Sequence, residues 1–93
     1  MIKPTIGRVL WYWPRIHETD KQPRAAIVTW VHRDDLVNLA VFDPNGKASG
    51  RTGVELYQGK GDRPDREHCE WMPYQIGQAA KDLHPVDQAK VGP

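Results

Sequence analysis

Aromatic rings and arginines are the side chains of this sequence whose types and spacing could support a binding function. The 93 residues include four Trp and three Tyr, and exposed rings flanked by Arg stack on nucleic-acid bases, accept proline-rich peptides or surround methylated amines. Tyr12 lies between Trp11 and Trp13, so it faces the opposite side of a strand from both. A small core also needs bulky rings, and we expect it to include at least one of these two Trp. The candidate binding residues, with exposed rings and nearby positive charge, are Tyr12, Tyr57, Tyr74, Arg8, Arg15 and Arg24.

Histidines and the cysteine are the candidate metal ligands, and their spacing argues against a metal site. Zinc sites use paired ligands at short fixed spacings, such as Cys-x-x-Cys. Only His68 and Cys69 are neighbours here, and adjacent strand residues point to opposite faces. The sequence therefore predicts no metal site, with histidines on the surface and a half-buried thiol. The full set of candidates is His17, His32, His68, His84 and Cys69.

Catalytic groups are not indicated either. Asp34 and Asp35 occupy a turn, where exposed Asp is common. The Gly-Lys-Gly at residues 59–61 lacks the further glycine, the Lys-Ser/Thr pair and the helix of a P-loop. Acidic residues on both sides of Cys69 disfavour the lowered thiol pKa of a nucleophile. We therefore predict neither an enzyme nor a cofactor.

Charge and composition indicate an ordinary globular protein. Thirteen Lys and Arg against 12 Asp and Glu leave a formal net charge of +1, without the basic excess typical of nucleic-acid-binding proteins. One cysteine permits no internal disulfide, and no apolar run approaches the ~20 residues that span a bilayer. These features predict a protein of the reducing cytoplasm without a membrane partner.

Short segments rich in β-branched and aromatic residues, bounded by Gly, Pro and Asp, predict an all-β fold. Five strands, a long first loop, two hairpins and a brief last strand match the order of a small SH3-like barrel. An OB-fold is the alternative, but no helix is available between the third and fourth strands. We expect one domain over residues 1–83, a short helical segment within residues 74–83, and a disordered tail over residues 84–93. The expected strands are Ile6–Trp13, Arg24–His32, Leu36–Phe42, Gly53–Tyr57 and Cys69–Met72.

The first predicted hairpin turns at residues 33–35, and the length of this turn decides which face of the hairpin is buried. A two- or four-residue turn pairs Trp30 with Leu39 and places Trp30 in the core. A three-residue turn buries Thr29 instead. We prefer the first register, because the second buries a hydroxyl and exposes Trp30.

The second predicted hairpin follows the turn residues Asp43-Pro44-Asn45-Gly46. A tight hairpin at this point carries the next strand out of register before Val54 arrives. We therefore expect a wider loop through Gly50, which lets Val54 meet Leu39 and places it on the apolar face.

Three strings of the sequence resemble a known group of proteins. They are Val-Asn-Leu-Ala-Val-Phe-Asp-Pro-Asn-Gly at residues 37–46, Cys-Glu-Trp-Met-Pro-Tyr-Gln at residues 69–75 and Gln-Ala-Ala-Lys at residues 78–81. Through them the chain resembles a family of small, uncharacterised proteins of tailed bacteriophages and prophages. The resemblance implies a phage accessory or virion-associated protein made in the cytoplasm of the bacterial host, and it implies no activity.

These observations together predict a non-catalytic protein-binding module, whose partner is a protein of the phage virion or of the host. The alternative is a small nucleic-acid-binding module that uses surface aromatics and the Arg residues of the first half. Salt separates the two, because nucleic-acid binding weakens steeply as counterions are released and a largely apolar contact does not.

Overall fold

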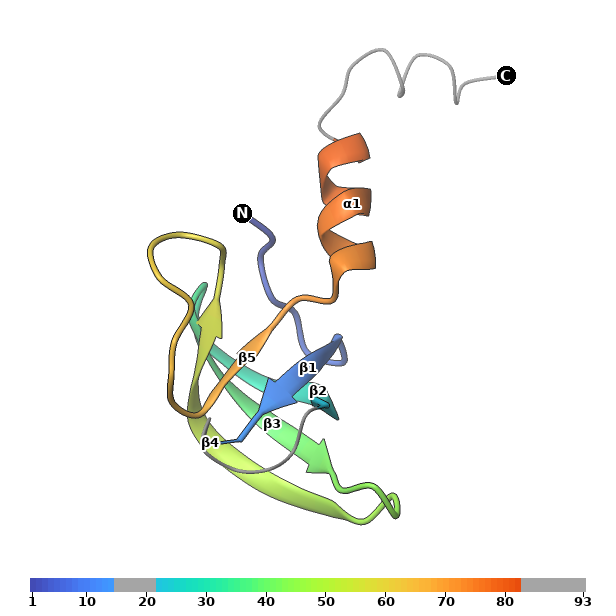
Figure 1. The fold of residues 1–93 in the computed structure, drawn as a ribbon. Coiled ribbons are helices and arrows are strands. Elements are labelled where there is room, and N and C mark those ends of the chain that lie inside the picture. Colours follow the sequence, from blue (N-terminus) through green and yellow to red (C-terminus); the bar gives the residue numbers. More distant parts are fainter. Residues whose placement is uncertain (15–21, 83–93) are drawn as a thin grey trace, which may run out of the picture.

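The strands of the protein follow the apolar segments of its sequence. The computed structural model describes residues 1–14 and 22–82, and Figure 1 shows these as a barrel with a helix at one end. The prediction of a five-stranded SH3-like barrel followed by a short C-terminal helix is confirmed. The elements are β1 (Val9–Trp13), β2 (Arg24–Arg33), β3 (Leu36–Phe42), β4 (Ala48–Tyr57), β5 (His68–Glu70) and α1 (Pro73–Asp82).

The barrel closes in the order β1-β2-β3-β4-β5, with β5 returning to β1. Neighbours in sequence from β1 to β4 are antiparallel, β5 is antiparallel to β1, and β4 and β5 are parallel. At least one parallel pair is required, because the neighbours in a closed ring can all be antiparallel only when the number of strands is even. The parallel contact is short, joining Leu56 to Cys69 and Tyr57 to Glu70.

A single cluster of side chains fills the barrel. Alternate residues of each strand point inward, and most of them are aliphatic, so burial of apolar area holds the strands together. The cluster comprises Leu10, Tyr12, Ala26, Val28, Val37, Leu39, Val41, Val54, Leu56, Cys69 and Trp71.

Trp30 lies outside this core, so its predicted burial is wrong. Its side chain is 56% exposed. The two-residue turn is present, but β2 shifts register against β3 twice, between Val31 and Arg33 and between Val28 and Trp30, so β2 carries two extra residues. The shift nearer the turn pairs Trp30 with Asn38 instead of Leu39. Val28 consequently pairs with Leu39, the partner expected for Trp30, and occupies the core in its place.

The hairpin between β3 and β4 is tighter than expected, and the wide loop through Gly50 is wrong. Phe42 pairs with Ala48. The N–H of Gly46 donates to the carbonyl of Asp43 at 2.9 Å, and the positive φ of Gly46, 87°, suits the end of this turn.

A bulge in β4 restores the buried face of this strand. The register of β3 against β4 shifts between Val37 and Leu39, opposite a stretch of β4 that contains Gly53 with a φ of 64°. Val54 therefore pairs with Val37 and is buried, whereas the sequence pattern paired it with Leu39. The predicted face is right and the predicted partner is wrong.

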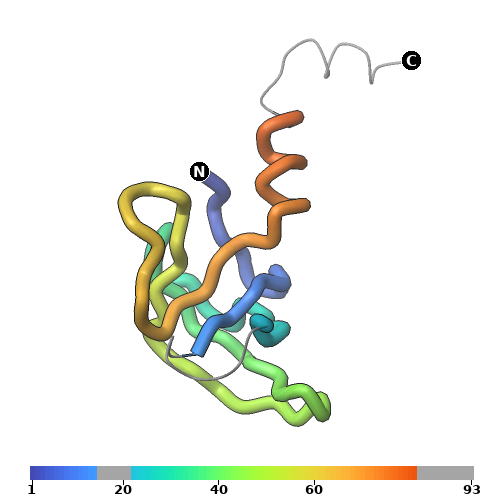
Figure 2. Tube along the Cα trace, in the orientation of Figure 1, coloured from blue at the N-terminus to red at the C-terminus, as the bar shows by residue number. Residues whose placement is uncertain are grey.

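Helix α1 stands apart from the barrel, beside the N-terminal segment (Figures 1 and 2). It begins at Pro73, a residue suited to a first helical turn because it needs no N–H partner there. No side chain of residues 73–81 is buried. Among the described residues no helix has the length and apolar character to cross a membrane. The predicted tail, residues 84–93, lies outside the described residues.

Candidate functional site: a groove between the barrel and its helix

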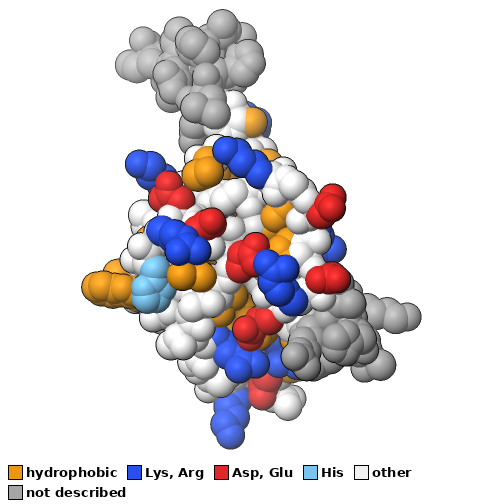
Figure 3. All heavy atoms as spheres, turned by 90° about the vertical axis from the view of Figure 1, so that its left-hand side faces the viewer, with side chains coloured by type: hydrophobic (Ala, Val, Ile, Leu, Met, Phe, Trp, Pro, Cys, Tyr) orange, Lys and Arg blue, Asp and Glu red, His pale blue; other side chains and the backbone are white. Residues whose placement is uncertain are grey.

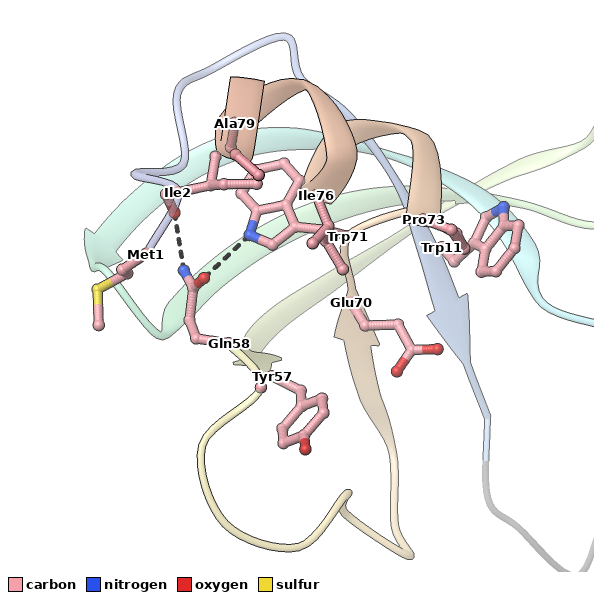
Figure 4. A pocket seen from close by; sticks show the side chains of 12 residues that line it. Met1, Ile2, Trp11, Tyr57, Gln58, Glu70, Trp71, Pro73, Ile76 and Ala79 are labelled. Atoms are coloured by element: carbon pink, nitrogen blue, oxygen red, sulfur yellow. Dashed lines mark hydrogen bonds between the residues drawn. The ribbon is translucent and has the colours of Figure 1, made fainter. Parts of the chain in front are cut away.

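A mostly apolar groove of about 440 Å³ lies where α1, the N-terminal residues and the ends of β4 and β5 meet. This volume is within the range of about 300–1,000 Å³ typical of binding pockets. Figure 4 shows the lining side chains arriving from segments that are far apart in the chain. The large ones are Ile2, Trp11, Tyr57, Trp71 and Ile76, with Met1 at one end.

Trp71 connects the groove to the core. Its ring is 4% exposed, and its indole N–H donates to Oε1 of Gln58 at 3.1 Å. The amide of Gln58 in turn donates to the carbonyl of Ile2 at 2.8 Å and to that of Asp34 at 2.9 Å. The guanidinium of Arg8 lies 5.8 Å from the centre of the Trp71 ring. These contacts fix the ring and tie the N-terminal residues to it (Figure 4).

Gln75 positions α1 as a wall of the groove. Its Oε1 accepts the backbone N–H of Met72 at 2.8 Å, as in a capping box. Its amide donates to the carbonyl of Val9 on β1 at 2.7 Å. The start of α1 is therefore fastened to the barrel, while Ile76, one residue further on, remains 55% exposed at the groove.

Glu70 is the carboxylate that lines the groove, and its charge is compensated. Both of its oxygens accept hydrogen bonds from Arg63, at 2.9 and 3.0 Å, a bidentate geometry of high strength. The indole N–H of Trp13 donates to the same carboxylate at 2.7 Å. The guanidinium of Arg63 also lies 4.8 Å from the centre of the Trp13 ring. The Glu70 side chain is therefore held rigidly at the edge of the groove, and its negative charge is not available to a ligand.

Tyr12 faces the core, so the prediction that its ring is exposed is wrong. It is 1% exposed, and its hydroxyl donates to the carboxylate of Glu67, which also pairs with Arg51 at 3.2 Å. Burial raises the pKa of Tyr12 to about 12. Trp11 and Trp13 take the outward face and are half-buried, so neither supplies the core ring that was expected from this pair.

The remaining predicted binding residues divide between two places. Tyr57 lines the groove, and Arg8 contacts its Trp71. Tyr74, 71% exposed, is in the first turn of α1. Arg24 is on β2 opposite Tyr12 and is half-buried. Arg15 lies outside the described residues.

His68 and Cys69 are both buried, which corrects the expected surface histidine and half-buried thiol. Cys69 faces the core with no exposed area, and burial raises its pKa to about 12. His68 points the other way, beside its β1 partner Trp13, and its Nδ1 donates to the carbonyl of Arg66 at 2.9 Å. His17 and His84 lie outside the described residues. In the described part of the chain, no three His, Cys, Asp or Glu side chains gather as a metal site.

Sequence reasoning did not identify Gln58, Trp71 and Ile76 as site residues. One signal was available: Ile76 is an isolated large aliphatic residue in a polar helix that starts at Pro73. The roles of Gln58 and Trp71 depend on contacts with the N-terminus that no local pattern reveals.

No protein-family model, no curated protein and no solved structure matches this chain.

Proposed function

We propose that this chain is a non-catalytic protein-binding module that receives an apolar segment of another protein in the groove beside α1. The observation that carries the proposal is the groove itself, in which Ile76 is exposed beside the fixed ring of Trp71. Fixed aromatic rings and aliphatic side chains in a concave surface supply most of the affinity of protein interfaces.

The exposure of α1 supports the same proposal. A helix of ten residues is marginal in water by itself, because most helical stability in proteins comes from packing of an apolar face. α1 is fastened at its start by Gln75, but Tyr74 and Ile76 are left largely exposed. A partner that covers these side chains would stabilise the helix as it binds.

The arginines favour a protein partner over a nucleic acid. At least four of the six arginines that the structure describes are in ion pairs with carboxylates, which lowers the positive potential available to phosphates. Figure 3 shows one face of the molecule, where basic and acidic side chains alternate instead of forming a basic stripe. The pairs are Arg33–Asp35, Arg51–Glu67, Arg63–Glu70 and Arg66–Glu55.

The proposal of a non-catalytic role is supported by the state of the potential nucleophiles. The thiol of Cys69 and the phenol of Tyr12 are buried, and the raised pKa of each keeps it protonated at neutral pH. The phage setting, with a virion or host protein as partner, rests on the resemblance of residues 37–46, 69–75 and 78–81.

A capture experiment with matched variants tests the proposal. Immobilised wild-type protein, Ile76→Ser and Trp30→Ser are exposed to a lysate of phage-infected bacteria, with and without nuclease. Both substitutions replace an exposed apolar residue, but only Ile76 lines the groove. We expect a protein that is retained by wild type and Trp30→Ser, lost with Ile76→Ser, and unaffected by nuclease. Capture that disappears with nuclease, or weakens steeply with salt, would favour the nucleic-acid alternative.

A further inference from the structure

Positive side chains without ion-pair partners follow, or contact, residues that line the groove. Three lysines directly follow residues that line it, and one arginine contacts its Trp71 ring. Within the part of the chain that the structure describes, none of the four is in an ion pair, whereas the arginines elsewhere on the barrel are mostly paired. They are Lys3 after Ile2, Lys60 after Gly59, Lys81 after Ala80, and Arg8.

The carboxylates in and beside the groove are mostly engaged in ion pairs. Of the Asp and Glu residues whose side chains are described, only Glu70 lines the groove, and Arg63 neutralises it. Asp34, Asp35 and Glu55 line an adjoining pocket that shares Met1, Tyr57 and Gln58 with the groove. Asp35 and Glu55 are paired with Arg33 and Arg66. Asp34 contacts Gln58 only through its backbone carbonyl. Around the groove, positive side chains outside ion pairs therefore outnumber carboxylates outside ion pairs, although the whole chain carries a formal net charge of only +1.

The polar groups inside the groove are already engaged, which bears on the conformation of an occupant. Gln58 uses its amide on Ile2, Asp34 and Trp71. The hydroxyl of Tyr57 donates to the carbonyl of Gly61 at 2.9 Å. An extended peptide would bury backbone N–H and C=O groups against these walls without partners, at a cost in free energy. A helix satisfies its own backbone and presents only side chains.

We propose that the occupant of the groove is an acidic amphipathic helix of another protein, with its apolar stripe against Trp71 and Ile76 and its carboxylates facing these positive side chains. This inference rests on the proposed function and adds the chemistry of the partner. The apolar stripe supplies affinity in the helix-in-groove mode, and the positive side chains select the sign of the polar face and its orientation.

Two synthetic peptides test the inference on nitrogen-15-labelled full-length protein. Each is an amphipathic helix of about 15 residues with the same leucine stripe at i, i+3, i+4 and i+7, and the polar face carries Glu in one peptide and Lys in the other. The indole N–H signals of Trp11 and Trp71 report on the groove. The signal of Trp30, which is exposed on β2 away from the groove, is the internal control.

We expect the Glu peptide to shift the Trp11 and Trp71 signals but not that of Trp30, and to bind about tenfold or more tightly than the Lys peptide at low salt. The preference should shrink as ionic strength rises. A Lys3→Glu, Lys60→Glu, Lys81→Glu triple variant should reverse it. Lys47→Glu, a charge reversal of an exposed residue after the β3–β4 turn, should leave it unchanged.

The outcomes separate this inference from the proposed function. Equal binding of both peptides, lost with Ile76→Ser, would overturn the acidic partner and leave the groove as a protein-binding site. Failure of both peptides to bind would overturn the helical partner, while the capture experiment decides the proposed function independently. Binding that survives Ile76→Ser would contradict both. A dimer in sedimentation that Ile76→Ser dissociates would make a second copy of this chain the occupant and overturn the inference.

Discussion

Tyr12 and Cys69 bring two ionisable side chains into the barrel core, and their pKa values link stability to alkaline pH. Burial is the largest cause of the raised pKa in both residues, and each reaches about 12, from ordinary values of 10.0 for Tyr12 and 9.0 for Cys69. A raised acid pKa means that the unfolded chain releases its proton first as pH rises. The contribution of each protonated side chain to folding stability is therefore fully present below its pKa in the unfolded chain. It is lost as the pH rises toward its pKa in the folded protein.

We expect the free energy of unfolding to fall between about pH 9 and 12, at up to about 1.4 kcal/mol per pH unit for each of the two protons. Urea titrations across this range measure the slope. Tyr12→Phe should make the fall shallower above pH 10, because it removes one of the two groups. A slope that is unchanged in Tyr12→Phe, or stability that rises with alkaline pH, would contradict the buried positions of these side chains.

Trp71 and Trp30 should differ in how much their removal lowers the free energy of unfolding. Trp71→Ala deletes a buried ring in contact with the core and should destabilise the protein by about 3–5 kcal/mol. Trp30→Ala removes an exposed ring and should change stability by about 0.5 kcal/mol or less. Denaturant unfolding of the two variants checks the difference. Equal losses would place Trp30 in the core, as the hairpin pattern had predicted.

The prediction of which side chains point into the core failed for β1, a strand that is apolar on both faces. β1 carries Leu10 and Tyr12 on one side and Trp11 and Trp13 on the other, so alternation alone cannot decide which side is inside. The choice depends on distant partners. The Tyr12 hydroxyl meets Glu67 from the loop before β5, and the Trp13 indole meets Glu70.

At the scale of elements, the sequence located the strands better than their pairing. β3 has the predicted bounds, and β2 extends one residue beyond them, because apolar alternation and turn residues define a strand locally. Pairing depends on three register shifts, two between β2 and β3 and one between β3 and β4. A bulge leaves no clear local signature, and β4 offers both Gly50 and Gly53 as places for one.

Gly53 and Gly50 provide a matched test of the bulge in β4. A Cβ added at either position meets nothing within 4 Å, but only Gly53 has a positive φ, 64°. Gly53→Ala should therefore cost about 1–2 kcal/mol through backbone strain alone. Gly50→Ala should be neutral or slightly stabilising, since it restricts the unfolded chain. Thermal unfolding compares them, and an equal effect of both substitutions would contradict the position of the bulge.

At the scale of the whole molecule, the groove is built from residues that are far apart in sequence. Gln58 reaches Ile2, and Gln75 reaches Val9. The barrel could be predicted because each strand has a local pattern of apolar and turn residues. Tyr57 and Arg8 were also predicted, as surface residues near a binding site. The groove could not be predicted from the sequence, because it forms only where the N-terminal residues, the end of β5 and α1 meet.

The central claim is that the groove beside α1 is where a partner protein binds, and site-specific photocrosslinking tests it most directly. A photoreactive phenylalanine analogue is placed at Ile76 in one variant and at Trp30 in another, since both positions are exposed and only the first lines the groove. After irradiation in a lysate of phage-infected bacteria, we predict a protein adduct at position 76 that protease removes and nuclease does not, with no equivalent adduct at position 30. The absence of an adduct at position 76, or an adduct there that nuclease removes, would contradict the account.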